Sequence, residues 1–265
     1  VILVCVKSNA TETITREISD HAGKDALVVS LQNGLSNREL LAASGRKTLG
    51  GMVAFNVVGE ANGVYTCTTD GDVILEAEAV SGELVRSMKG AGMTAKTTGK
   101  IEAVLWGKLC LNLNNALNVL SGVPLRTQLQ DRDHRRVMAM CIEELLAVAR
   151  ARGIRPARIA KAPPGLIPFI LRLPTPMFER VAASMIRIDP KARTSMWNDL
   201  QAGRPPEVDY LNGQVIMEGL KAEVPTPVNQ RVVELVKQAF EHGQSPELSG
   251  RELMAMVSDV QVGHI

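Results

Sequence analysis

The first 34 residues, VILVCVKSNATETITREISDHAGKDALVVSLQNG, contain two runs of apolar and β-branched residues, at 1–6 and 26–31. Such runs are typical of strands that are buried on both faces of a parallel sheet. Between them, apolar residues at helical spacing followed by Gly23 predict a helix over 11–22. A strand, a helix and a second strand in so short a segment form a βαβ unit, which predicts a parallel sheet.

The α/β pattern continues to about Gly99 and then gives way to helices. Further strands are expected at 48–55 and 93–97, an antiparallel hairpin from 64–67 and 72–76, and helices at 36–44 and 80–89. Helical periodicity then covers 101–121, 131–152, 178–188, 191–202, 207–222 and 226–243, with a proline-rich loop or pair of short turns at 162–176. The fold class is therefore α/β followed by all-α, and we expect a domain boundary between residues 99 and 100.

Composition excludes several classes of protein. Lys plus Arg is 30 and Asp plus Glu is 28, which leaves a net charge of +2 and no concentrated basic face for nucleic acid. Aromatic residues make up 3%, which is poor material for stacking bases or sugars. No stretch approaches the roughly 20 apolar residues of a membrane span, and Val1–Val6 is too short for a signal peptide. We expect a cytoplasmic protein with no nucleic-acid or membrane partner.

Polar residues follow the first two predicted strands. Lys7 comes directly after the first strand, and Asn33 comes shortly after the second. The carboxyl ends of strands in a doubly wound sheet face the ligand crevice, so both side chains are candidates for ligand binding. The alternatives are an ordinary Asn33-Gly34 turn and a solvated lysine at the end of a strand.

The segment 104–120, VLWGKLCLNLNNALNVL, is apolar nearly all round but carries Lys108, Asn112 and Asn115. These positions fall on one face of a helix and form a polar stripe. Buried ammonium and amide groups need partners, so the stripe indicates either a polar ligand or a solvated lysine with asparagines bonded to backbone. A desolvated lysine has a lowered pKa, which suits it to donate a proton near neutral pH.

A second polar segment, SMWNDLQAGRPPEVDYLNG, covers residues 195–213. Ser195 and Glu207 lie on either side of a helix end predicted at Ala202-Gly203. The alternative to a ligand-binding role is helix capping, with Ser195 in the first turn after Thr194 and Glu207 as an acid at the start of the next helix.

Other kinds of active site are not indicated. The four histidines have no ligand-like spacing, so we expect no metal site. The sequence has no GxSxG nucleophile elbow and no phosphate-binding loop with a Walker lysine.

Taken together, five segments resemble the ketopantoate reductase (2-dehydropantoate 2-reductase) family, in order and over essentially the whole chain. They are VKS (6–8), LQNG (31–34), WGKLCLN (106–112), SMWNDLQAGRPPEVDYLNG (195–213) and VPTPVN (224–229). The spacing of 26 residues from Lys7 to Asn33 and of 12 from Ser195 to Glu207 also agrees with the family.

The resemblance implies NADPH-dependent reduction of 2-dehydropantoate to pantoate, a step toward pantothenate and coenzyme A. It implies that residues 1–99 are an incomplete Rossmann-like dinucleotide-binding domain and that 100–265 are a helical substrate domain, of a kind that often forms homodimers. It assigns Lys108 as general acid. The implied cofactor contacts are Lys7, Asn33 and Glu207, and the implied substrate contacts are Asn33, Asn112, Asn115 and Ser195.

The chain departs from the family pattern at three places. The family's second asparagine, eight residues after the lysine, is replaced by Ala116, with Asn115 one position earlier, and Arg126 stands where another substrate asparagine can occur. The GxGxxG segment that opens the family is absent, and we expect about two βαβ-sized segments to precede Val1. The residues that distinguish NADP from NAD normally follow that segment.

Two other functions therefore remain open. One is reduction of a different branched 2-keto acid, which the altered asparagine pattern favours. The other is a non-catalytic helical binding or dimerisation module whose α/β part is vestigial.

Overall fold

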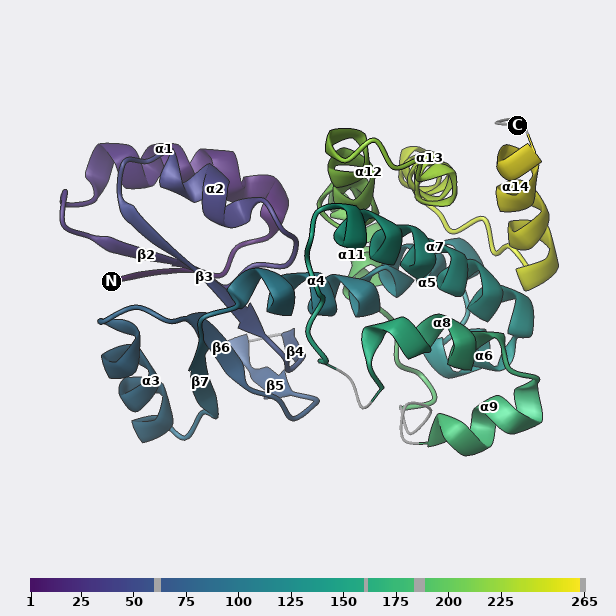
Figure 1. Ribbon diagram of the computed structural model, residues 1–265, viewed down its shortest axis with the longest axis horizontal. Coiled ribbons are helices and arrows are strands. Elements are labelled where there is room, and N and C mark those ends of the chain that lie inside the picture. The colour runs from purple at the N-terminus through teal and green to yellow at the C-terminus, as the bar shows by residue number, and fades with distance from the viewer. Residues whose placement is uncertain (60–62, 160–161, 184–188, 263–265) are drawn as a thin grey trace. The chain divides into compact units, whose positions relative to one another are not determined.

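The computed structural model describes residues 1–59, 63–159, 162–183 and 189–262. The chain divides into two compact units, residues 1–108 (unit 1) and 109–265 (unit 2). Their boundary lies inside helix α4 (Figure 1). The domains predicted from the sequence, 1–99 and 100–265, differ from the two units by the first part of this helix.

Unit 1 contains a mixed five-stranded sheet in the order β1-β2-β3-β6-β7. The strands are β1 (Ile2–Val4), β2 (Leu27–Ser30), β3 (Lys47–Val53), β6 (Val73–Glu76) and β7 (Ala95–Thr98). The first three strands are parallel, β6 runs antiparallel to β3, and β7 is parallel to β6. The βαβ unit predicted from the first 34 residues is confirmed.

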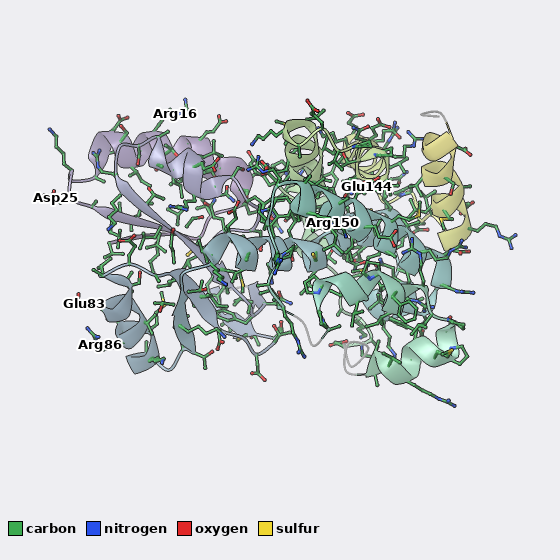
Figure 2. The ribbon with its side chains drawn as sticks, viewed as in Figure 1. Arg16, Asp25, Glu83, Arg86, Glu144 and Arg150 are labelled. Atoms are coloured by element: carbon green, nitrogen blue, oxygen red, sulfur yellow. The ribbon has the colours of Figure 1, made fainter. Side chains whose placement is uncertain are left out.

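Helices cover both faces of this sheet. They are α1 (Thr11–His21), α2 (Asn37–Ala42) and α3 (Ser81–Gly90). Unit 1 also contains a 3-10 turn, η1, at Ser8–Ala10 and the first part of helix α4 (Ile101–Asn112). Figure 1 shows α1 and α2 on one face and α3 on the other. Arg16 on α1 and Glu83 and Arg86 on α3 project away from the sheet (Figure 2).

Strand β2 explains why the two faces are both covered, because all four of its residues are buried. Val28 packs with Ile18 and Leu41 on the α1 and α2 face, and Val29 belongs to the core cluster on the α3 face. Side chains alternate between the faces of a strand, so a continuous apolar run needs a hydrophobic partner on each side. Burial of one such valine contributes about 1.5–3 kcal/mol.

The predicted hairpin from 64–67 and 72–76 is wrong. Strand β5 (Tyr65–Cys67) instead pairs with β4 (Val57–Gly59), and β6 joins the main sheet between β3 and β7. The residues of β5 are exposed, whereas Val73–Leu75 are buried. A continuous apolar run belongs in the interior of a sheet, and this outweighs the short turn that connects the two strands in sequence.

The prediction that the first strand is buried on both faces is also wrong. Among the described residues, strand β1 is at an edge of the sheet and pairs with β2 alone. Val4 is buried, but Leu3 is 47% exposed and Val1 and Val6 are exposed as well. The apolar run predicts the strand correctly, but it does not determine the neighbours of the strand.

Unit 2 is helical throughout its described residues. Its elements are α5 (Asn114–Ser121), α6 (Leu125–Gln130), α7 (Arg132–Ala151), η3 (Pro164–Leu166), α8 (Ile167–Arg172), α9 (Thr175–Val181), α11 (Ser195–Gln201), η4 (Val208–Tyr210), α12 (Asn212–Lys221), α13 (Pro227–His242) and α14 (Gly250–Val262). Helix α7 is central and packs against α5, α6, α8, α12, α13 and α14. The predicted change from α/β to all-α is confirmed.

Unit 2 differs from the prediction in its details. The helix expected over 101–121 is divided at Leu113 into α4 and α5, although Leu113 keeps nearly helical angles of φ −57° and ψ −26°. The proline-rich segment contains α8 and α9, because Pro168 and Pro176 lie in first turns, where their missing N–H groups cost nothing. Helices α6 and α14 are additional, and 184–188 of the helix expected at 178–188 lie outside the described residues.

Candidate active site

The loops that carry Lys7 and Asn33 leave the same edge of the unit 1 sheet. Strands β1 and β2 are parallel, with Val4 opposite Ser30. The hydroxyl of Ser8 donates a 2.8 Å hydrogen bond to the backbone carbonyl of Asn33, so the two loops are in direct contact. Both candidate side chains are half-buried. The expectation that these residues share one sheet edge is confirmed, and their binding roles stay predictions.

A buried chain of polar side chains lies behind these loops. Asn37 donates to Ser8 Oγ at 3.0 Å and to the carbonyl of Asn33, and its own Oδ1 accepts a bond from Thr11 at 2.8 Å. Gln32 donates to the hydroxyl of Thr11 at 2.8 Å. Satisfied buried networks are rigid, because any displacement leaves a desolvated polar group without a partner. The network therefore fixes the backbone from which Asn33 projects.

The backbone bends at the Asn33-Gly34 pair, in agreement with the alternative interpretation. Gly34 has a φ of 97°, which is in the region where a side chain is strained. Ser8 and Asn37 both donate their hydrogen bonds to the backbone carbonyl of Asn33.

Lys108 lies in helix α4 among buried apolar residues, which include Trp106 and Leu109. Its side chain is partly exposed, and desolvation by burial lowers the pKa of its ammonium group. A lysine in this condition gives up its proton more readily than a solvated one. The lowered pKa supports the chemical use that the sequence predicts, a positioned proton donor.

Asn112 and Asn115 are on different helices. Asn112 is the last residue of α4, one helical turn after Lys108, and Asn115 is in the first turn of α5. Both are half-buried. Within the described part of unit 2, the side-chain amide of Asn115 makes no hydrogen bond, so the alternative in which it bonds to neighbouring backbone is not supported there.

Ser195 is the first residue of helix α11 and is exposed. The capping function belongs to Thr194, whose hydroxyl accepts a 3.3 Å hydrogen bond from the backbone N–H of Trp197. Ser195 is therefore not required as a cap, and its hydroxyl is presented at the start of the helix.

Glu207 does not cap a helix either. It precedes the 3-10 turn η4, and its side chain makes no capping hydrogen bond to that turn. It is nevertheless buried, at 7% exposure. Burial of a carboxylate is costly unless the group is paired or hydrogen-bonded, so helix capping alone does not explain the burial of Glu207.

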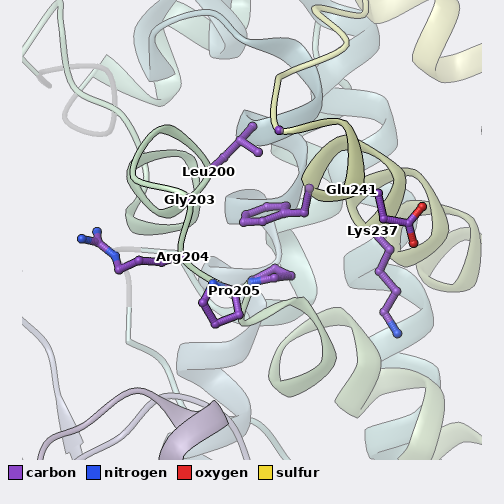
Figure 3. Close-up of a pocket in the computed structure, with 9 residues that line it drawn as sticks. Leu200, Gly203, Arg204, Pro205, Lys237 and Glu241 are labelled. Carbon is purple, nitrogen blue, oxygen red and sulfur yellow. The ribbon is translucent and has the colours of Figure 1, made fainter.

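A pocket of about 480 Å³ in unit 2 is not the predicted site. Figure 3 shows Leu200, Arg204 and Pro205 on one side and Lys237 and Glu241 on the other. Its two cations already have carboxylate partners, Asp199 for Arg204 at 2.9 Å and Asp209 for Lys237 at 2.8 Å. None of the predicted site residues lines this pocket.

The described residues contain no group of three or more His, Cys, Asp or Glu side chains that could hold a metal ion. In the same part of the chain, no helix is both long and apolar enough to cross a membrane.

Two models of known protein families match the chain. The model described as ketopantoate reductase PanE/ApbA C terminal matches residues 100–240, and the model ketopantoate reductase PanE/ApbA matches residues 1–79. The chain belongs to the ketopantoate reductase family. The resemblance seen in the sequence motifs is therefore confirmed. Ketopantoate reductases are oxidoreductases.

Individual relatives agree with this assignment. The 2-dehydropantoate 2-reductase of Archaeoglobus fulgidus is 30% identical, over 89% of this chain and 75% of the relative. The crystal structure of a PanE/ApbA family ketopantoate reductase from Ralstonia eutropha has a TM-score of 0.77 at 26% identity, covering 91% of this chain and 76% of the other. A ternary structure of D-mandelate dehydrogenase with NADH and anilino(oxo)acetate has a TM-score of 0.75 at 20% identity, covering 92% and 77%, and shares the fold. A Rossmann-like sheet followed by a helical domain is thus confirmed as the fold class.

The sequence missed the residues that hold the candidate side chains in place. In unit 1 these are Ser8, Thr11, Gln32 and Asn37, and in unit 2 they include Asn118, which is fully buried in α5. A signal existed for Asn118, since it follows Asn115 at helical spacing inside an apolar run. A buried amide in such a run must have hydrogen-bond partners.

Proposed function

We propose that this ketopantoate reductase family member reduces 2-dehydropantoate to pantoate with NADPH. The observation that carries the proposal is Lys108, a half-buried lysine with a lowered pKa that lies one helical turn before Asn112. The 30% identity to the Archaeoglobus fulgidus enzyme over 89% of the chain supports the substrate.

The residues at the sheet edge suit a dinucleotide. Lys7 and Asn33 lie at the carboxyl end of parallel strands, the edge where such folds bind nucleotides. A lysine there complements a phosphate, and an asparagine can donate and accept hydrogen bonds. Bound there, a reduced nicotinamide cofactor supplies the hydride. The D-mandelate dehydrogenase that shares the fold binds NADH, so the preference for NADPH is part of the proposal.

The chain's own residues would act on the keto acid. The ammonium of Lys108 donates its proton to the carbonyl oxygen as the hydride reaches the carbon, which converts the ketone to a hydroxyl group. Before the proton is transferred, the positive charge of the ammonium stabilises the negative charge that develops on this oxygen. Asn112, Asn115 and Ser195 hold the carboxylate and hydroxyl groups of the substrate, as does Asn33 from the cofactor side. The proposal also gives Glu207 a role in cofactor binding.

A second candidate is the reduction of another branched 2-keto acid. Ala116 replaces an asparagine of the family pattern, and Asn115, one position earlier, has a side-chain amide without a hydrogen bond in the described part of unit 2. A shifted amide changes which oxygen atoms of a substrate can be bound.

NADPH oxidation by the full-length protein tests the proposal. The assay supplies 2-dehydropantoate, smaller 2-keto acids and phenylglyoxylate in parallel, with NADPH and with NADH. The proposal expects the highest kcat/KM for 2-dehydropantoate with NADPH. Preference for another keto acid would favour the second candidate. Failure to bind either nicotinamide cofactor would support a non-catalytic binding module.

Location in the cytoplasm and assembly as a homodimer through the helical unit complete the proposal. Light scattering of the purified protein measures its mass in solution, and a mass of one chain would contradict the dimer.

A further inference from the structure

Asn118 is a fully buried asparagine in helix α5 whose amide is hydrogen-bonded at both ends. Its Nδ2 donates to the carbonyl of Val123 and to Gln128 Oε1, each at 2.9 Å. Its Oδ1 accepts a 3.0 Å bond from the backbone N–H of Thr194. The last bond joins residues 76 positions apart in the sequence and is entirely within unit 2.

Gln128 limits the freedom of this amide. It receives a bond from Asn118 on its oxygen and donates from its nitrogen to Asn114 Oδ1 at 2.8 Å. The three side chains are buried. Rotation of the Asn118 amide by half a turn would place acceptor against acceptor at Gln128 Oε1 and donor against donor at the Thr194 N–H, so the orientation that presents Oδ1 to Thr194 is fixed.

Thr194 transmits this restraint to helix α11. It is the N-cap residue, its hydroxyl accepts from Trp197 N–H, and its carbonyl accepts from Asn198 N–H at 3.1 Å. Ser195 is the next residue. The Thr194 backbone, which the Asn118 side chain holds, is one peptide unit before Ser195. Because the peptide is planar and the helix fixes the following dihedral angles, the position of Thr194 determines the position of the Ser195 Cα–Cβ bond.

The surrounding segment has other contacts, and one of them is at Thr194 itself, whose hydroxyl donates a 3.4 Å hydrogen bond to the backbone carbonyl of Asn115. Leu125 N–H donates to the carbonyl of Ala192 at 2.9 Å, and the guanidinium of Arg193 lies over the Trp197 ring at 4.4 Å. These contacts attach the segment to helix α6 and to its own helix. Asn118 supplies the side-chain contact to the backbone N–H of the residue directly before Ser195.

We propose that Asn118 is a positioning residue that places the hydroxyl of Ser195 for the keto-acid substrate. The inference rests on the proposed function, since it gives Ser195 its role in substrate binding. Asn118 acts through Thr194 and does not touch the substrate itself. Loss of the Asn118 side chain should therefore weaken keto-acid binding and leave the cofactor affinity unchanged.

The first experiment compares Asn118→Ala with the parent in the full-length protein. The KM for 2-dehydropantoate should rise about tenfold, the effect of losing one hydrogen bond to a charged group. The Kd for NADPH, measured by fluorescence titration, should not change, which also shows that the variant is folded. Ser121→Ala is the matched control, because Ser121 is a buried residue of the same helix that bonds only the backbone carbonyl of Asn118 among described residues.

The second experiment is a double-mutant cycle with Ser195→Ala. If Asn118 acts through Ser195, the tenfold effect of Asn118→Ala on KM should shrink to about twofold or less in the Ser195→Ala background, as coupled residues are not additive. Equal effects in both backgrounds would overturn the inference. Asn118→Ser takes the place of the alanine variant if that variant does not fold, and failure of both to fold would mark Asn118 as purely structural.

The two proposals fail in different ways. A parent protein that does not oxidise NADPH with any 2-keto acid contradicts the proposed function. An active parent whose KM is unaffected by Asn118→Ala contradicts the positioning role alone.

Discussion

The hydroxyl of Ser8 donates a 2.8 Å hydrogen bond to the backbone carbonyl of Asn33. The two residues follow different strands and are 25 positions apart. Their contact joins the two loops that leave the carboxyl edge of the parallel strands, and Asn37 bonds to both partners. The position of the Asn33 side chain thus depends on residues that have no chemical role of their own.

Replacement of Asn37 by alanine should destabilise unit 1 and weaken cofactor binding. The change removes the acceptor of Thr11 and the donor to Ser8 in a buried site, and an unsatisfied buried group costs about 1–3 kcal/mol. Urea unfolding measures the loss of stability, and NADPH titration measures the rise in Kd. Asn9→Ala, an exposed asparagine in the adjacent turn η1, is the control. Equal behaviour of the two variants would show that the network does not hold the loop.

The sequence predicted the strands and the change to helices, because burial on a sheet or a helix leaves a period in neighbouring residues. Runs such as Leu27–Ser30 are recognisable from their own composition. The pairing of Val73–Glu76 with β3 and β7 was missed, since β5 is the nearer strand in sequence and only the burial of the whole sheet favours the more distant partners.

The candidate site was predictable only in part, for a similar reason. Lys108 stands out because a charged residue interrupts an apolar helix. The partners of Asn37 and Asn118 were not predictable, because Ser8 and Thr194 lie 29 and 76 residues away from them. A buried polar network is defined by the folded structure, so its members have no sequence pattern in common.

Replacement of Lys108 by methionine should lower kcat about 10²-fold, the usual contribution of a positioned acid. Lys100→Met, an exposed lysine just before the same helix, should have no effect. An equal loss in both variants, or none in Lys108→Met, would contradict the role of Lys108.

The pH dependence of kcat gives a separate test of Lys108. Burial lowers its pKa, and the acid must be protonated to act. At low pH Lys108 is fully protonated, so its titration should not limit kcat there. The value of kcat should fall as the pH rises through the lowered pKa of Lys108. The alkaline limb should begin below the pH expected for a solvated lysine. A rate that stays constant up to the ordinary range of lysine would show that burial does not tune this group.

Replacement of Arg135 by methionine should strongly destabilise unit 2. Arg135 is 1% exposed and donates to the carbonyls of Leu171, Leu129 and Leu173, with its guanidinium 4.1 Å from the Phe178 ring centre. Each such bond contributes about 0.5–1.5 kcal/mol, and the variant leaves several buried carbonyls without a donor, so a loss of about 3 kcal/mol is expected.

The neighbouring arginine is the control for Arg135. Arg136 is exposed and pairs with Asp133 at 3.1 Å, and a surface ion pair contributes about 0–1 kcal/mol. Urea denaturation should therefore separate Arg135→Met from Arg136→Met by about 2 kcal/mol or more. Similar midpoints would mean that the carbonyls find other donors.

Glu144 of α7 provides a test of stability against pH (Figure 2). Its carboxylate accepts bonds from the backbone N–H groups of Val228 and Asn229 at 2.8 and 2.9 Å, in the first turn of α13. Desolvation by burial raises its pKa, although these hydrogen bonds oppose the shift.

The sign of the pH effect follows from that raised pKa. The unfolded chain has a glutamate pKa of about 4.3, and the folded protein has a raised pKa. Between these two values the folded state binds more protons, so stability falls as the pH rises through this window. Glu144→Gln removes the titration, and its stability relative to the parent should therefore improve with rising pH, even though the amide caps α13 less well than the carboxylate. Glu143→Gln, at an exposed residue of the same helix that pairs with Arg172, is the control for the loss of a carboxylate. Urea unfolding of the three proteins from pH 4.5 to 7.5 measures the free energy of unfolding at each pH. Parallel pH profiles for the parent and Glu144→Gln would show that the hydrogen bonds from α13 cancel the effect of burial on the pKa.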